Sequence, residues 1–175
     1  MRLPSGVLAL LLVCMPAHSA KFGVGQTPSP ELLRAWDIDV SPSGAGLPAG
    51  SGDVALGRTL YAQLCAACHG ASGEGGPMDR LVGGAGTLTG GKPVKTVGSF
   101  WPYATTLFDY IRRAMPFNAP QSLTDDQVYA LTAYVLYLNG IVGETDVLDA
   151  RTLPKVIMPN RNGFVPDPRP DVSGR

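Results

Sequence analysis

The sequence predicts an all-α domain in the middle of the chain, between two segments of extended character. All of the clear helix-type apolar patterns lie between residues 53 and 140. Residues 21–52 are rich in Pro, Gly and Ser, and residues 141–175 contain five prolines. We therefore expect an N-terminal extended arm over residues 21–52, one domain over residues 53–140 and a Pro-rich tail over residues 141–175.

The first helix is expected to begin at Asp53, because aspartate is a good N-cap residue. Leu56, Leu60 and Leu64 then recur at every fourth position and predict an apolar stripe. The helix is expected to carry residues 65–69 at its end and to stop at Gly70. Residues 70–98 follow as a glycine-rich loop, since they have too little apolar periodicity for a long helix.

The second helix is predicted over residues 103–114. Its apolar face would contain Leu107, Tyr110, Ile111 and Ala114, and Pro116 would end it.

The third helix is predicted to begin at Thr124, because residues 124–127 match the capping-box pattern that ends in Gln127. Between residues 128 and 138 every residue except Thr132 is apolar, tyrosine or alanine, and residues 139–140 close the helix. A helix that is apolar all round must be covered on several sides. The core and the terminal arms would cover it, or a partner subunit would cover part of it.

The chemistry of the chain is concentrated in the sequence Cys65-Ala66-Ala67-Cys68-His69. Cys-x-x-Cys-His is the attachment sequence of c-type haem: both thiols form thioethers with the porphyrin, and the imidazole binds the iron. A thioredoxin-like redox motif would need a βαβ context, and a zinc site would need further Cys or His ligands. Neither is visible, and a single motif predicts one haem.

Residues 1–20 have the pattern of a secretory signal peptide, with Arg2 before an apolar core over residues 7–13 and small residues before Ala20. The core is far shorter than the roughly 20 residues of a membrane-spanning helix. Cleavage near Ala20 would leave two cysteines and one histidine, all within the haem motif. A lipoprotein signal ending at Cys14 is the alternative. Export predicts a periplasmic protein.

The overall charge excludes several kinds of partner. The formal net charge is zero, and loss of Arg2 would leave 13 basic against 14 acidic residues. The chain has no basic block for nucleic acid and no polybasic membrane patch.

The pattern resembles a class I c-type cytochrome over about residues 53–140. That fold has three to four helices around one covalent haem, and its first and last helices cross where a small residue meets an aromatic one. Gly57 and Tyr134 stand at the corresponding places, with Tyr61 nearby.

A narrower resemblance rests on longer strings: WDIDV at 36–40, GLP at 46–48, GSFWPYATTLFDYIRRAMP at 98–116, YVLYLNGIV at 134–142 and MPNRNGF at 158–164. Together these look like the cytochrome subunits of Sox-type sulfane dehydrogenase and related sulfite dehydrogenases. The resemblance implies that the chain takes electrons from a molybdenum-cofactor subunit and passes them to a downstream cytochrome or oxidase. The longest Sox-type members carry two haems, whereas this chain has one motif.

His69 is expected to be the proximal iron ligand, because it is the only histidine beyond residue 20. Met115 is the preferred sixth ligand: prolines at 116 and 120 restrict its loop, and the resemblance also points to it. Met158 is the rival, and Met78 lies too close to His69 to reach the opposite haem face.

Four further residues are candidates for haem contacts. The resemblance implies that the carbonyl of Pro77 accepts the ring N–H of His69. Trp101 and Tyr103 would pack on the haem or bond a propionate, with core packing as the alternative. Arg112 or Arg113 would pair with a propionate, or both would simply be solvated.

Three functions are compatible with these patterns. The preferred one is a monohaem electron-transfer subunit of a sulfite or sulfane dehydrogenase, without catalytic residues of its own. A freestanding soluble electron carrier is the main alternative. A haem enzyme or gas sensor is disfavoured, because the chain has no distal histidine.

Overall fold

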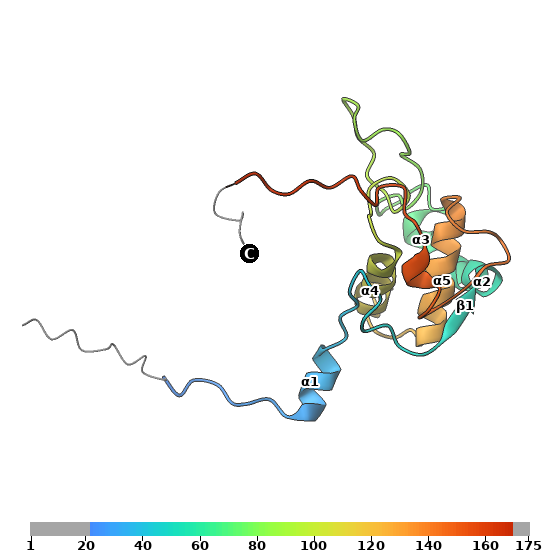
Figure 1. Ribbon diagram of the computed structural model, residues 1–175. Coiled ribbons are helices and arrows are strands. Elements are labelled where there is room, and N and C mark those ends of the chain that lie inside the picture. Colours follow the sequence, from blue (N-terminus) through green and yellow to red (C-terminus); the bar gives the residue numbers. More distant parts are fainter. Residues whose placement is uncertain (1–21, 170–175) are drawn as a thin grey trace, which may run out of the picture. The chain divides into compact units, whose positions relative to one another are not determined.

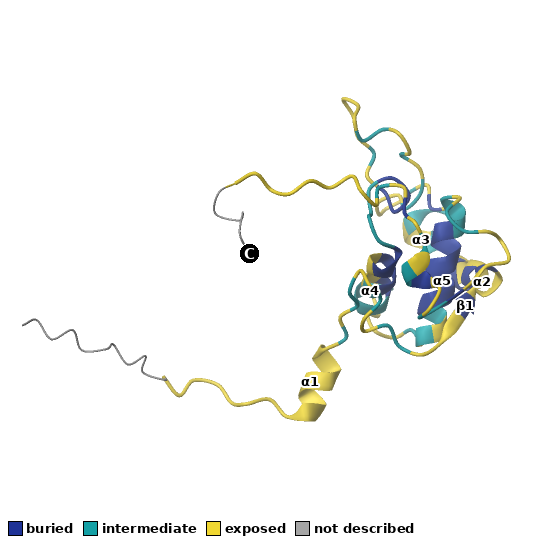
Figure 2. Cartoon of the chain, in the orientation of Figure 1, coloured by how far each residue is buried: buried dark blue, intermediate teal, exposed yellow. Residues whose placement is uncertain are grey.

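The computed structural model describes residues 22–169, which divide in sequence into a first unit that ends at Trp36 and a second that begins at Asp37 (Figure 1). The predicted signal peptide lies outside the described residues. The first unit contains the short helix α1 (Pro30–Trp36), in which no residue is buried (Figure 2). Among residues 22–169, no helix combines the length and the apolar character that crossing a bilayer requires.

The second unit is built around helix α5 (Asp125–Leu138), which packs against α2 (Val54–Leu64) and α4 (Ala104–Ala114). A one-turn helix, α3 (Ala66–His69), follows α2 almost directly. The predicted helical character of the central region is thus confirmed.

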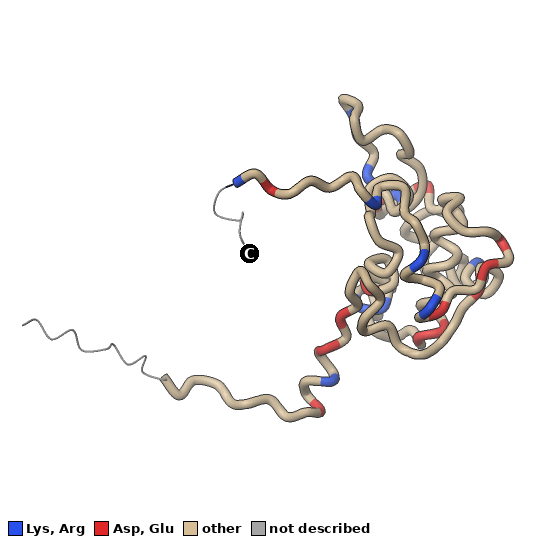
Figure 3. The backbone as a smooth tube through the Cα atoms, in the orientation of Figure 1, with Lys and Arg blue, Asp and Glu red and all other residues tan. Residues whose placement is uncertain are grey.

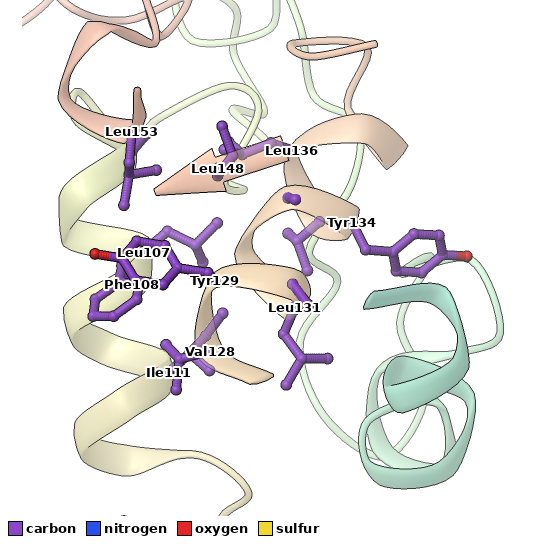
Figure 4. Packing of buried hydrophobic residues seen from close by; sticks show 14 of the residues in the cluster. Leu107, Phe108, Ile111, Val128, Tyr129, Leu131, Tyr134, Leu136, Leu148 and Leu153 are labelled. Carbon is purple, nitrogen blue, oxygen red and sulfur yellow. The ribbon is translucent and has the colours of Figure 1, made fainter. Parts of the chain in front are cut away.

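Helix α5 begins with the predicted capping box. The Thr124 hydroxyl accepts a hydrogen bond from the Gln127 backbone N–H at 3.3 Å, and the Gln127 side chain accepts one from the Thr124 N–H at 2.9 Å. All nine residues from 128 to 136 are buried, as the sequence pattern predicted. Figure 4 shows α4 residues packed on one side of α5, while Tyr134 points to the other side.

Helix α2 begins where the sequence predicted, since the Asp53 carboxylate accepts a hydrogen bond from the Leu56 N–H at 2.7 Å. Its predicted apolar stripe is wrong in part, because Leu56 and Leu64 are 43% and 41% exposed. The buried face consists instead of Val54, Gly57, Leu60 and Tyr61. This buried side packs against α5, and its spacings of three, three and one residues are as typical of a helix as a spacing of four.

The crossing of α2 and α5 depends on Gly57. A β-carbon added there would lie 2.0 Å from the Ala130 carbonyl oxygen and 2.7 Å from the Tyr134 β-carbon. The rings of Tyr61 and Tyr134 meet beside this contact, with centroids 5.3 Å apart. The predicted Gly57–Tyr134 contact is confirmed, and Ala130 is the additional member that the pattern did not indicate.

Helix α4 starts one residue later than predicted and ends at Ala114, before Met115. Leu107 and Ile111 are buried as expected, but Tyr110 is half exposed. Phe108 takes the buried place and packs on Tyr129 with ring centroids 4.4 Å apart (Figure 4).

Residues 37–52 and 141–169, on either side of residues 53–140, are part of the second unit. Two three-residue strands, β1 (Ser51–Asp53) and β2 (Val147–Asp149), pair antiparallel and lie against α5. No strand was predicted there, because runs of three residues have no useful periodicity. The Tyr129 hydroxyl donates to the Pro48 carbonyl at 2.8 Å, and Leu153 is fully buried. Pro48, β1 and β2, which lie within the predicted arm and tail or at their edge, therefore pack against α5.

Candidate haem site

The motif spans the single turn of α3: Cys65 precedes the turn, and Cys68 and His69 lie on it. Its N-cap is Cys65 and its C-cap is Gly70, so the turn is separate from α2 rather than its continuation. The N–H groups of Cys68 and His69 both bond to the Cys65 carbonyl, at 3.1 and 3.0 Å. Residues three and four apart on a helix face the same side. Cys68 and His69, three and four residues after Cys65, are therefore placed on the same side of the turn as Cys65.

Gly70 allows the chain to turn away directly after His69. Its φ is +85°, and a β-carbon there would lie 2.6 Å from the Glu74 carboxyl carbon and 2.7 Å from the Gly75 carbonyl oxygen. The Tyr61 hydroxyl donates to the Gly70 carbonyl at 3.1 Å. The end of α3 is thus tied to α2.

The first cysteine of the motif is not in the environment of a reactive thiol. Cys65 and Cys68 are both free, and burial raises the pKa of the Cys65 thiol to about 11. A reactive Cys-x-x-Cys motif needs a lowered thiol pKa, because the thiolate is the nucleophile. The raised pKa argues against the thioredoxin-like alternative.

The imidazole of His69 is oriented by a backbone carbonyl, but not by the predicted one. Its Nδ1 lies 2.7 Å from the carbonyl oxygen of Asp79, so Nδ1 carries the proton and donates it. Nε2 is then the nitrogen that can bind a metal. The carbonyl of Pro77 does not have this role in the structure.

The shift from Pro77 to Asp79 follows from the turn around them. The Met78 N–H donates to the Cys68 carbonyl at 3.0 Å, and its own carbonyl accepts from the Gly76 N–H at 3.1 Å. Both backbone groups of Met78 are occupied in this way, and the next carbonyl, that of Asp79, faces the imidazole.

The three methionines beyond residue 20 have different environments. Met158 is 1% exposed and belongs to the hydrophobic core, whereas Met78 is 50% exposed. Met115 is the C-cap of α4, is half-buried and packs at the edge of the core. A methionine that is buried among core residues, as Met158 is, usually fills space in the core. These environments favour Met115 over Met158, and its ligation of iron stays a prediction.

Both arginines at the end of α4 already have protein partners. The Arg112 Nε lies 3.2 Å from an Asp125 carboxylate oxygen, and Arg113 pairs with Asp39 and Asp109. Asp125, at the start of α5, compensates the charge of Arg112, and the pairing of Arg112 with a propionate stays a prediction.

Trp101 and Tyr103 are both half-buried. Trp101 makes an edge contact with Tyr110, with centroids 5.7 Å apart, and the Arg161 guanidinium lies 4.4 Å from the Tyr103 ring centre. Their contact with haem stays a prediction. Arg161 was missed as a neighbour, because its only signal was its place in the 158–164 string.

The haem-motif geometry fits a covalently attached haem. The thiols are free and share one face, and the histidine tautomer leaves Nε2 available. A methionine at the end of another helix is partly accessible. Haem c bound by such residues supplies reversible one-electron chemistry, and its axial ligands set the potential.

Comparisons with known proteins agree with this geometry. A family model described as cytochrome c matches residues 54–139. The thiosulfate dehydrogenase of Stutzerimonas stutzeri strain A1501 is 31% identical over 90 residues, which are 50% of this chain and 28% of that protein. That of Psychrobacter arcticus is 29% identical over 113 residues, which are 61% of this chain and 34% of that protein. The chain thus spans only about a third of these curated relatives.

A solved structure is similar over more of the chain. A chain in the crystal structure of the sulfane dehydrogenase SoxCD from Paracoccus pantotrophus is 49% identical and superposes with a TM-score of 0.79. The match covers 85% of this chain and 74% of that chain. The chain belongs to the cytochrome c family, whose members transfer electrons through covalently bound haem c.

Proposed function

We propose that this protein is the monohaem electron-transfer subunit of a periplasmic sulfur-compound dehydrogenase. It would accept electrons from a molybdenum-cofactor subunit that oxidises sulfite or a sulfane, and it would pass them to a downstream cytochrome or oxidase. The observation that carries the proposal is the 49% identity to a chain of a sulfane dehydrogenase over 85% of this chain. That coverage extends well beyond the 86 residues that the cytochrome c model matches.

The proposed iron ligands are His69 and Met115. The Asp79 carbonyl would hold the imidazole in orientation, and a neutral thioether on the opposite side would favour ferrous iron and raise the potential. A positive potential suits a carrier that receives electrons from an enzyme.

Purification from the native source tests the partner. We expect a molybdopterin protein to co-purify, and we expect sulfite or a protein-bound sulfane to reduce the haem in the complex. A cytochrome that is recovered alone, and that none of these donors reduces when the cell extract is added back, would contradict the proposal.

A freestanding electron carrier is the second candidate. It is favoured by the packing of residues 37–53 and of β2 against α4 and α5, because segments that cover their own domain need no partner to cover them. Analytical ultracentrifugation of the native material distinguishes the two candidates, since a subunit would sediment as a larger complex and a carrier as a monomer of 18.3 kDa or less.

Residues 1–20 are proposed to direct export and to be removed near Ala20. N-terminal sequencing of the mature protein tests this, and a mature N-terminus at Met1 would contradict it. Mass spectrometry of the same sample tests the count of one haem, which the polypeptide should carry through Cys65 and Cys68.

A further inference from the structure

The last turn of α4 is fastened to the segment that enters the second unit. Asp109 stands at the centre of this contact: one carboxylate oxygen accepts from the Val40 N–H at 3.1 Å and from the Arg113 guanidinium at 2.8 Å. Its other oxygen accepts from the Arg113 Nε at 3.3 Å. The side chain of Asp109 is only 24% exposed, so these bonds are partly shielded from water.

Arg113 extends the contact to a second carboxylate. The same Nη2 that bonds Asp109 also lies 2.7 Å from an oxygen of Asp39. The pairing with Asp109, followed by the contribution of Asp39, raises the pKa of Arg113. Charge-assisted bonds of this kind are roughly twice as strong as neutral ones. Figure 3 shows acidic and basic positions close together where this segment runs past α4.

The segment over residues 38–42 contacts α4 at both of its ends. The Arg112 guanidinium reaches the Ile38 carbonyl at 3.5 Å, and the Thr105 hydroxyl reaches the Pro42 carbonyl at 3.4 Å. Arg112 also joins α4 to α5 through Asp125. Residues 38–42 therefore act as a strap along the side of α4.

Met115 lies directly beyond the strapped turn. Its N–H makes the last backbone bond of the helix, to the Ile111 carbonyl at 3.1 Å, and Ile111 is the last buried residue of α4. Helix ends fray readily, because their last carbonyls lack partners within the helix. The position of Met115 thus depends on Ile111 on the core side and on Arg113 and Asp109 on the strap side.

We propose that Asp109 and Arg113 are positioning residues for the sixth iron ligand. By fastening the last turn of α4 to residues 38–42, they hold the Met115 sulfur where it would bind the iron. This inference rests on the proposed ligation by Met115. It assigns the segment before β1 a function in the haem site, although that segment contributes no ligand itself.

Competition by imidazole measures how firmly the sulfur is held. Ferric holoprotein is titrated with imidazole, and the thioether–iron charge-transfer band is followed as it disappears. In Asp109→Asn the side chain keeps its shape and loses its charge, so imidazole should bind about tenfold more tightly, as expected from weakening one charge-assisted contact. An affinity equal to that of wild type would overturn the proposal.

Glu144→Gln is the matched control. It removes one negative charge from another ion pair, that of Glu144 with Arg58 on α2, which is far more exposed. Imidazole affinity in this variant should stay at the wild-type value. If both variants change equally, the effect comes from net charge and the positioning role is refuted.

Arg113→Lys is the second variant, because a lysine keeps the charge but cannot bond both Asp39 and Asp109 with a planar fork. We expect a rise of about threefold in imidazole affinity, smaller than that of Asp109→Asn. No rise in this folded variant would also count against the proposal.

Met115→Ala separates this inference from the proposed function. If the variant keeps the charge-transfer band, Met115 is not the ligand and the proposed site itself fails. If it loses the band while Asp109→Asn and Arg113→Lys bind imidazole like wild type, only the positioning role fails.

Discussion

Helix α5 and the loop over residues 70–103 belong to the same unit but are held by different forces. Nine consecutive residues of α5 are buried, and α2, α4 and both strands pack around it. Residues 70–103 contain no helix or strand and are mostly exposed or half-buried. Burial of apolar surface organises the first region, whereas hydrogen bonds from a few small polar side chains organise the second.

Side-chain hydrogen bonds gather within residues 83–99 of the loop. The Ser99 hydroxyl donates to the Val94 carbonyl at 2.6 Å and accepts from the Thr96 N–H at 2.9 Å. The Thr96 hydroxyl donates to the Gly83 carbonyl at 2.6 Å. The helices are thus held together by apolar packing, and the loop by local polar contacts.

The largest expected effect is at the helix crossing that supports the scaffold. Gly57→Val would bring a side chain against the Ala130 carbonyl, and the backbone of α5 cannot yield without unpacking its neighbours. We expect a loss of about 4 kcal/mol in the free energy of unfolding, or no folded protein at all. Denaturant unfolding measures this, and a loss below about 1 kcal/mol would show that the crossing is not tightly packed.

Replacing Met158 and Met115 separately compares a core position of the scaffold with the proposed iron ligand. Met158→Ala should cost about 3 kcal/mol of stability, because it empties a core position, and should leave the thioether band intact. Met115→Ala should remove the band and lower the potential with a smaller loss of stability. Denaturant unfolding, absorbance and redox titration distinguish the two, and the reverse pattern would assign the ligand to Met158.

A smaller, local effect is expected within the loop. Ser99→Ala removes all three hydrogen bonds of the hydroxyl, to the Val94 carbonyl, the Thr96 N–H and the Thr96 hydroxyl, at a cost of about 1–3 kcal/mol. Hydrogen exchange should speed up about tenfold or more for amides of residues 83–99 and stay unchanged in α5. Equal acceleration in α5 would mean that loop and scaffold unfold together.

The smallest expected effect is on the pH dependence of stability, through Asp149 at the end of β2. Backbone N–H groups of Thr152 and Arg151 lower the pKa of Asp149 to about 2. The unfolded carboxylate has a pKa of about 3.9, so this stabilisation is complete above that pH and disappears as the pH falls toward 2. Unfolding measured from pH 5 to pH 2 should show a weaker pH dependence in Asp149→Asn than in wild type. Parallel curves would exclude this contribution.

Much of the scaffold was readable from the sequence, because its signals are local. Asp53 and the capping box at Thr124 start their helices where predicted, and the all-apolar run of α5 is buried throughout. The face of α2 was misjudged because Leu56 and Leu64 repeat as regularly as the buried residues do. Only the position of α5 determines which repeat is covered.

The haem-attachment motif over residues 65–69 was enough to predict the cofactor from the sequence, because thioether attachment requires those residue types in that spacing. Tertiary structure decided everything that depends on contacts between distant segments. The carbonyl that orients His69 belongs to Asp79 rather than Pro77, since the fold of the turn selects it. Arg112 and Arg113 bind carboxylates rather than stand free, since residues 38–42 and α5 lie beside α4. A sequence lists such charges but does not say which of them meet.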